Sequence, residues 1–205
     1  MRSRIFAVAV LTVFAAPAFA ETPVETYAGQ TINKGIAILK DGTLSDKARQ
    51  DAIRAYLQSA LDIRRIALFA LGPTARTAAP PDLAAYVQAF ENFTLANYSS
   101  RVGAYGGQTL KVTSAAERSP GDFIVTVAII DPKATAADPG DSAQFRVLSE
   151  PNGGFAIVDA SVEGVWFEVA QRDDFQGYLA QNGGSLAKLI EHINQMTAQI
   201  SAPAH

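Results

Sequence analysis

The sequence predicts a single domain of the α+β class, with helices first, an antiparallel sheet next and two helices at the end of the chain. Apolar residues recur at helical spacing in the first half, alternate with a period of two across residues 109–163, and then return to helical spacing. Helices and strands that are segregated along the chain are typical of α+β folds, and helices covering one face of a small sheet are the simplest packing. We therefore expect a curved, four-stranded antiparallel sheet packed on helices.

The first 20 residues have the features of a secretory signal peptide. Arg2 and Arg4 precede an apolar run over residues 5–14, and Ala18-Phe19-Ala20 is a typical cleavage site. The apolar run is too short to span a membrane. We expect residues 21–205 to form one exported domain that works in the bacterial periplasm.

Composition and charge argue against several classes of function. The whole chain carries 17 basic and 20 acidic residues, whereas general nucleic-acid binding requires a basic face. It contains no cysteine, which excludes disulfides, thiol chemistry and cysteine-based metal sites. An exported domain of this composition must be stabilised by its hydrophobic core alone.

Four stretches of helical spacing precede the strands: Tyr27–Leu39, a stretch that starts after Ser45, Ile63–Leu71, and a long stretch from Pro81 toward Tyr105. Ser45 and Asp62 are residue types that commonly cap the start of a helix, and Gly72-Pro73 should end the third one. Proline in the first turn, as at Pro81, is also typical of a helix start. After the strands, helical spacing returns until a glycine pair, and Ser185 then caps a last helix.

Period-two alternation predicts four strands: Thr109–Ser114, Phe123–Ile130, Gln144–Glu150 and Phe155–Glu163. Turn-forming residues at Ser119–Asp122 and Pro151–Gly154 predict hairpins between neighbouring strands. The second of these strands is almost entirely apolar, so we expect it to be central, with both faces covered.

The last strand runs into a helix through Glu163-Gly164. We expect Gly164 to let the backbone leave the sheet, so that the helix starts at Val165. The even-numbered face of this strand, from Ala156 to Gly164, consists of small apolar residues and should face the helices. Asp159, Ser161 and Glu163 should then face the other way, as an edge or solvent-facing row.

Candidate catalytic groups are few, and no common catalytic or phosphate-binding motif occurs in the sequence. Asp159 and Glu163 share a strand face, but positions four apart on a strand are roughly 13 Å apart, which is too far for direct cooperation. His192 lies off the apolar stripe of the last helix and is expected at the surface. An enzyme would have to use Asp159, Glu163 or tyrosine side chains, so we expect no catalytic activity.

Apolar faces are the most prominent feature of the sequence. The long helix carries large aromatic residues, whereas the last strand carries small ones. Plain core packing explains each residue singly, but large side chains on helices opposite small ones on a sheet could also leave room for an apolar ligand. Periodicity does not separate these two interpretations.

Three stretches of the sequence resemble a known family: "DIRRIALFALG" (Asp62–Gly72), "LAAYVQAFENFTLANYSSRVGAYGGQTLKV" (Leu83–Val112) and "FAIVDASVEGVWF" (Phe155–Phe167). They are similar to the periplasmic phospholipid-binding proteins of the Mla, or toluene-tolerance, lipid transport family. The Glu163-Gly164-Val165 junction is the most specific part of this resemblance. The sequence departs from the family at Pro73-Thr74-Ala75, where an aromatic pair is common, and this bears on the pocket rim and the lipid species. A hopanoid-associated branch of the family also exists.

The resemblance implies a soluble, monomeric carrier that needs no cofactor and binds no nucleic acid. It would shuttle phospholipid between an outer-membrane lipoprotein complex and an inner-membrane ABC transporter whose periplasmic part is a ring of MCE domains, and so maintain outer-membrane lipid asymmetry. The fold would be cone-like, similar to the cystatin and nuclear transport factor 2 folds, with the acyl chains between sheet and helices and the head group near solvent.

The residues expected to line the apolar cavity are Ile66, Phe69, Ala70, Tyr86, Val87, Phe90, Phe93, Tyr98, Val125, Val127, Phe145, Val147, Val158, Ala160, Val162, Trp166 and Val169. Arg76 and Arg101 are expected at the rim, near the head group. Three alternatives remain open at this point. They are a carrier of hopanoids or other apolar ligands, a small enzyme on a nuclear transport factor 2-like fold, and an adaptor or chaperone that binds proteins through apolar patches.

Overall fold

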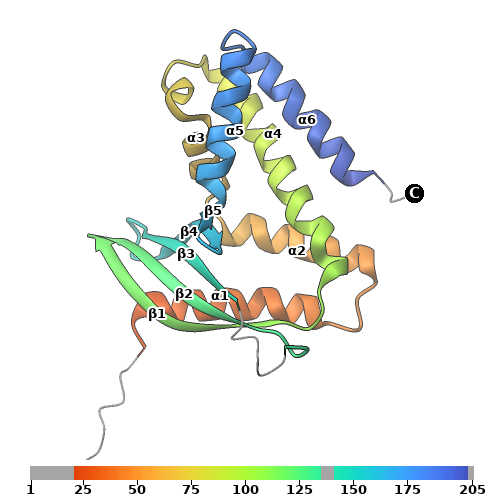
Figure 1. Cartoon of the computed structure of the whole chain (residues 1–205), viewed down its shortest axis with the longest axis vertical. Coiled ribbons are helices and arrows are strands. Elements are labelled where there is room, and N and C mark those ends of the chain that lie inside the picture. The colour runs from red at the N-terminus through yellow and green to blue at the C-terminus, as the bar shows by residue number, and fades with distance from the viewer. Residues whose placement is uncertain (1–20, 135–140, 203–205) are drawn as a thin grey trace, which may run out of the picture.

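A computed structural model describes residues 21–134 and 141–202 of the chain. The domain is α+β, as the sequence predicts (Figure 1). Its helices are α1 (Pro23–Lys40), α2 (Asp46–Ala60), α3 (Ile63–Leu71), α4 (Pro80–Ser99), α5 (Phe167–Gln181) and α6 (Leu186–Ser201), with the short 3-10 helices η1 (Gly72–Arg76) and η2 (Ser100–Ala104). Its strands are β1 (Thr109–Ser119), β2 (Asp122–Ile130), β3 (Ser142–Ser149), β4 (Phe155–Val162) and β5 (Val165–Trp166).

The predicted helix caps are present. The side chains of Ser45, Asp62 and Ser185 each accept a hydrogen bond from the backbone N–H three residues on, at 3.3, 3.0 and 3.3 Å. Gly72 ends α3 with a φ of 62°, which glycine adopts without strain. The long fourth helix is shorter than predicted, since α4 ends at Ser99 and continues only as η2.

The strands form one open antiparallel meander in the order β1-β2-β3-β4-β5, so the sheet has five strands rather than the four predicted. The additional strand comes from Glu163-Gly164, whose φ angles of 53° and 80° are both positive. Positive φ at both central residues is the requirement of the tight two-residue turn that matches the twist of a hairpin. The backbone therefore turns back to pair Val165 with Val162, and the helix begins at Phe167, not at Val165 as predicted.

Two hydrophobic cores stabilise the fold. The helical core joins α3, α4, α5 and α6, which stand together on one side of the sheet in Figure 1. At its centre the rings of Tyr86, Phe90 and Phe175 pack with centroids 6.0–6.3 Å apart, and the buried Tyr86 hydroxyl donates to the Ala67 carbonyl oxygen at 3.0 Å. The second core lies between α1 and the sheet, and Leu61 packs against both cores.

Within the part of the chain that the structure describes, helices cover only one face of the sheet. Val125 and Val127 of β2 are completely buried under α1. The opposite face of β2 is partly open, since Ile124 and Ala128 are half-buried and Ile130 is 48% exposed. The prediction that both faces of this strand are covered is therefore wrong, because the helices other than α1 pack on one another and not on the outer face of the sheet.

No helix among residues 21–134 and 141–202 has both the length and the hydrophobicity needed to cross a membrane. The predicted signal peptide, residues 1–20, lies outside the described residues.

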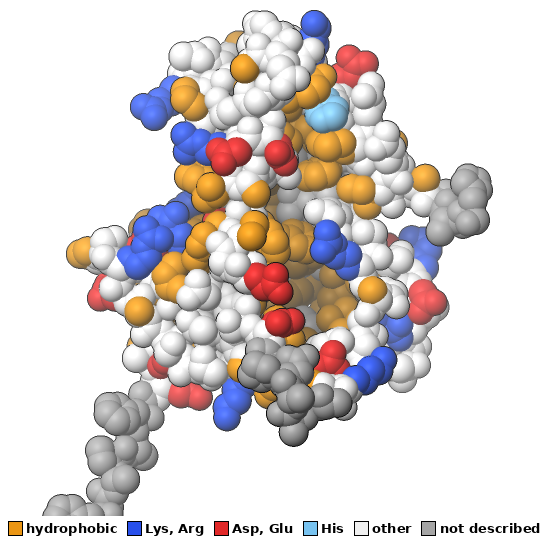
Figure 2. Space-filling view, viewed as in Figure 1, with side chains coloured by type: hydrophobic (Ala, Val, Ile, Leu, Met, Phe, Trp, Pro, Cys, Tyr) orange, Lys and Arg blue, Asp and Glu red, His pale blue; other side chains and the backbone are white. Residues whose placement is uncertain are grey.

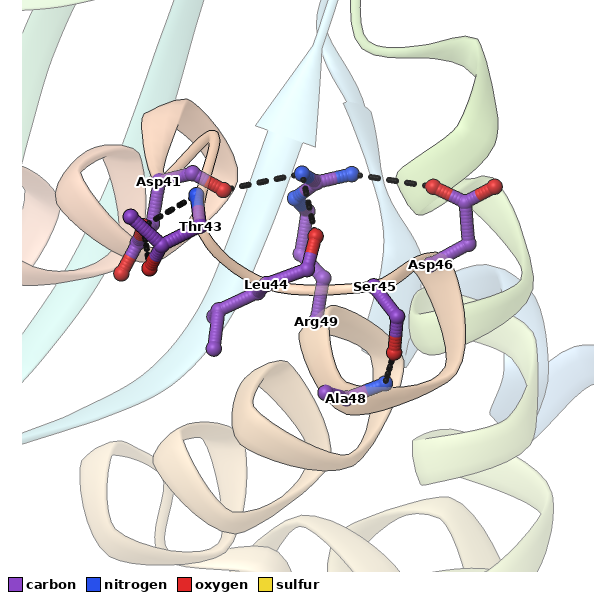
Figure 3. A network of polar contacts seen from close by, with 7 residues as sticks. All are labelled: Asp41, Thr43, Leu44, Ser45, Asp46, Ala48 and Arg49. Atoms are coloured by element: carbon purple, nitrogen blue, oxygen red, sulfur yellow. Dashed lines mark hydrogen bonds and ion pairs between the residues drawn. The ribbon is translucent and has the colours of Figure 1, made fainter.

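A polar network fixes the turn between α1 and α2 (Figure 3). The Arg49 guanidinium donates to the backbone carbonyl oxygens of Asp41 and Leu44 at 2.9 and 3.1 Å and pairs with the Asp46 carboxylate at 3.1 Å. The Arg49 side chain is only 19% exposed, whereas that of Asp46 is 96% exposed. The two carbonyl contacts therefore hold the turn, while the ion pair lies in water.

We expect Arg49→Met to lower the free energy of unfolding by about 1–2 kcal/mol, because it leaves two carbonyl groups of the turn without their charged donor. Urea denaturation at neutral pH measures the change. Asp46→Asn is the matched control, since it removes only the exposed ion pair and should alter stability little. Equal effects of the two substitutions would show that the carbonyl contacts do not hold the turn.

Candidate functional site

A largely apolar cavity of about 450 Å³ lies between the α1–α2 pair, the inner face of the sheet and the end of α4. This volume falls within the range of roughly 300–1,000 Å³ that is usual for small-molecule sites. Figure 2 shows hydrophobic side chains lining a recess on this face of the molecule, between the sheet and the helices. The aliphatic and aromatic side chains that line the cavity make it suitable for binding an apolar ligand.

Helices α1 and α2 form much of the wall. Ile32, Ile36 and Leu39 of α1 and Ile53 and Leu57 of α2 line it. Their helical spacing is visible in the sequence, but the pattern does not reveal that the two apolar stripes flank a cavity and do not close completely on each other.

A close contact sets the distance between α1 and α2. A Cβ atom added to Gly35 would lie 3.1 Å from the ring of Tyr56, so glycine lets that ring approach the α1 backbone. The Tyr56 hydroxyl donates to the Thr31 carbonyl oxygen. The two helices are therefore joined by a polar contact within an otherwise apolar wall.

Of the residues predicted to surround the ligand, Ile66, Tyr98, Phe145, Ala160 and Arg101 line this cavity. The remaining predicted residues lie elsewhere. In or against the helical core are Ala70, Tyr86, Val87, Phe90 and Phe93; in or against the core under α1 are Val125, Val127, Val147 and Val162. Val158 is buried away from the wall, Trp166 is half-buried in β5, Phe69 and Val169 are 38% and 46% exposed, and Arg76 ends η1.

A β-bulge explains why the predicted faces of β4 hold for only half of the strand. Arg146 of β3 pairs with Asp159, but its neighbour Val147 pairs with Ile157, so Val158 is an extra residue. An extra residue reverses the alternation on one side of the bulge. Ala160 lies on the inner side as predicted, whereas nearer the start of the strand it is Ile157, and not an even-numbered residue, that lines the cavity.

The row of polar residues on β4 is not solvent-facing as predicted. Asp159 and Ser161 are buried, with only 8% and 1% of their surface exposed. One Asp159 carboxylate oxygen accepts hydrogen bonds from the backbone N–H groups of Ala160 at 2.7 Å and of Glu168 at 3.1 Å. Asp159 therefore caps the first turn of α5 from the neighbouring strand. Only Glu163, in the hairpin turn, is exposed as expected.

Glu168 is the second acidic residue of the cavity, and the sequence analysis missed it. It lies in the first turn of α5, lines the cavity, and has a buried Oε2 atom that makes no hydrogen bond to any described residue. Burial, and secondarily the nearby Asp159, raise the Glu168 pKa to about 8. Burial also raises the Asp159 pKa, and its two backbone hydrogen bonds oppose this shift. In the sequence, the one feature that marks Glu168 is its position as an acidic residue within the apolar run Val165–Val169.

Tyr98 and Arg101 complete a polar cluster with Asp159 and Glu168 on the cavity wall. Burial, with the negative charges of Glu168 and Asp159, raises the Tyr98 pKa to about 12, and the Arg101 guanidinium opposes the shift. Arg101 is exposed, whereas Tyr98 is half-buried. The cluster therefore combines the Arg101 cation, which contacts water, with the Tyr98 and Glu168 side chains, which both carry a proton at neutral pH. Within residues 21–134 and 141–202, no group of three or more His, Cys, Asp and Glu side chains is placed to hold a metal ion.

Comparisons with known proteins are consistent with this geometry. The phospholipid-binding protein of Ralstonia solanacearum, solved in complex with a phospholipid, has the same fold with a TM-score of 0.75 at 16% identity, over 87% of this chain and 98% of that chain. No curated protein matches the sequence significantly. The family model described as MlaC protein matches residues 29–195, which is most of the chain, so the chain belongs to the MlaC protein family.

Proposed function

We propose that this protein is a periplasmic lipid carrier that holds the acyl chains of a phospholipid in the cavity between α1, α2 and the sheet. The observation that carries the proposal is an apolar cavity of about 450 Å³ in a member of the MlaC family. The Ralstonia solanacearum protein of the same fold was solved with a phospholipid bound, which supports a lipid as the ligand.

The energetics of acyl chains explain why a carrier needs such a cavity. An acyl chain of about sixteen carbons gains roughly 12 kcal/mol on leaving water, at about 0.8 kcal/mol per CH₂ group. A protein that moves a lipid across an aqueous compartment must offer a comparable apolar environment. The wall made by Ile32, Ile36, Leu57 and Phe145 supplies it, and lipid transfer requires no catalytic group.

The proposal extends to the route of transport. The protein would exchange lipid with an outer-membrane lipoprotein complex and with an inner-membrane ABC transporter that carries MCE domains. It would work as a monomer, since the cavity is formed within one chain. Arg101 is exposed and lines the cavity, which supports the proposal that it binds the lipid phosphate.

Lipid extraction combined with native mass spectrometry tests the proposal directly. Protein purified from a bacterial host should carry phospholipid in a fixed stoichiometry, and lipid-free protein should take labelled phospholipid from liposomes. The head group and chain lengths of the extracted lipid also distinguish a phospholipid from a hopanoid. A protein that is reproducibly empty and takes up no lipid would contradict the proposal.

A small enzyme is the second candidate, because Asp159 and Glu168 bring two carboxyl groups with raised pKa values to one cavity. The structural role of Asp159 as a helix cap weighs against it, since one of its two carboxylate oxygens already accepts two backbone hydrogen bonds. Turnover of an apolar ester that Asp159→Asn abolishes, in a variant that still folds, would favour the enzyme.

A further inference from the structure

The polar cluster described above is unexpected in a cavity whose proposed task is to hold hydrocarbon. An apolar wall is sufficient for acyl chains, and a carboxyl group in it is costly unless it has a partner. Glu168 keeps a buried Oε2 atom without a hydrogen-bond partner among the described residues. A bound ligand that supplies the missing partner would resolve this unfavourable arrangement.

The exposure of Arg101 and the partial burial of Tyr98 match the order of groups in a diacyl phospholipid. Arg101 is exposed, and Tyr98 lies one turn earlier on the same side of α4 and η2, half-buried in the cavity wall. In a phospholipid the phosphate comes first, the two ester carbonyl groups next and the acyl chains last. The ester carbonyl oxygens are hydrogen-bond acceptors only, so they require donors.

Glu168 and Tyr98 are both able to donate. The Tyr98 phenol keeps its proton throughout the physiological range, because its pKa is raised to about 12. Glu168 is largely protonated at pH 7, so it carries one O–H donor and presents no charge to an anionic phosphate nearby. The other titratable groups that interact with this pair are Asp159 from β4, Tyr86 from α4 and Arg101 from η2. The Arg146 guanidinium acts on Asp159 in turn and opposes the rise of the Asp159 pKa.

From this arrangement we infer that Glu168 and Tyr98 form a subsite for the ester carbonyl groups of the bound lipid, so that the cavity selects ester-linked diacyl lipids over ether-linked lipids with the same chains and head group. The inference rests on the proposed lipid-carrier function and adds a specificity to it. Acyl-chain burial supplies the affinity, and the subsite determines which linkage binds best.

Competition between two matched lipids tests the inference. Lipid-free full-length protein is offered vesicles that contain equal amounts of dipalmitoyl phosphatidylcholine and its ether-linked dihexadecyl counterpart, and native mass spectrometry counts the bound species. The wild type at pH 7 should favour the ester lipid by about three- to tenfold, the range expected for one hydrogen bond. The preference should decrease as the pH rises through about 8, where Glu168 ionises.

Two substitutions at one position separate the donor from the charge. Glu168→Leu removes one of the two donors and leaves Tyr98, so the ester preference should decrease and should no longer depend on pH. Glu168→Gln keeps an N–H donor that does not ionise, so the preference should persist at pH 9. Glu191→Leu, a matched change on the exposed face of α6, should behave as the wild type. Circular dichroism confirms that each variant is folded.

The outcomes distinguish this inference from the proposed function. Equal binding of the two lipids by the wild type at pH 7 would overturn the ester subsite and leave lipid carriage intact. A preference in Glu168→Leu that is as large as that of the wild type, with the same pH dependence, would also overturn it. Failure of the folded wild type to bind either lipid would overturn the carrier function itself.

Discussion

We expect the Glu168→Gln variant to be more stable than the wild-type protein at pH 7, by as much as about 3 kcal/mol, and equally stable near pH 4. In the unfolded chain the Glu168 carboxyl titrates at its ordinary pKa, near 4.5, whereas in the folded protein its pKa is about 8. Between these values the folded state binds one proton more than the unfolded state. Wild-type stability therefore falls as the pH rises across this window.

Urea denaturation between pH 4 and pH 9 measures the difference between the two proteins. Glutamine has nearly the same shape as glutamic acid and does not ionise, so the variant lacks the contribution of this group. The raised pKa of Asp159 also lowers stability as the pH rises, but it does so in both proteins. Its contribution therefore cancels, to first order, in the difference between their free energies of unfolding. Stability curves that run parallel at all pH values would show that Glu168 titrates normally. Glu191→Gln, on the exposed face of α6, is the control.

The second large effect concerns the cavity volume. We expect Ala160→Trp to reduce the amount of bound lipid at least about fivefold, because the indole ring would occupy space that an acyl chain needs. The free energy of unfolding should change by less than about 1 kcal/mol, since the ring enters an existing cavity and does not overpack a filled core. Lipid extraction after purification and thermal unfolding measure the two quantities separately.

Two further variants make this test specific. Ala116→Trp adds the same ring to an exposed position of β1 and should leave lipid loading unchanged. Ile36→Trp narrows the cavity from α1 and should reduce loading as Ala160→Trp does. Normal loading in both narrowed but folded proteins would show that the lipid binds elsewhere.

Local chemistry in the sequence was sufficient to predict most of the helices and strands. Ser45, Asp62 and Ser185 cap helices through hydrogen bonds that span three residues, so a short window contains all the partners. The glycine at Gly72 ends α3 for an equally local reason, its positive φ. Glu163-Gly164 was harder to interpret, because a break in a strand permits either a helix start or a tight hairpin, and only the pairing of Val165 with Val162 decides between them.

The cavity was predicted less well than the fold, because its walls depend on contacts between distant segments. Tyr86 and Phe90 have the same spacing and chemistry as wall residues, yet Phe175 from the other half of the chain buries them in the helical core. The bulge at Val158 leaves no mark in the sequence and reverses which β4 residues face inward. Glu168 reaches the cavity because the β4–β5 hairpin returns the chain to Asp159.

The presence of two cores has a consequence for how this domain can vary. The aromatic core of α3 to α6 contains few of the cavity residues, whereas α1 and α2 supply much of the cavity wall. The turn between α1 and α2 is held by the hydrogen bonds of Arg49. The residues that line the cavity and those that form the aromatic core are therefore encoded in largely separate parts of the chain. Substitutions along the first two helices can widen or narrow the space for cargo while the aromatic scaffold keeps its shape, so one architecture can be adapted to lipids of different bulk.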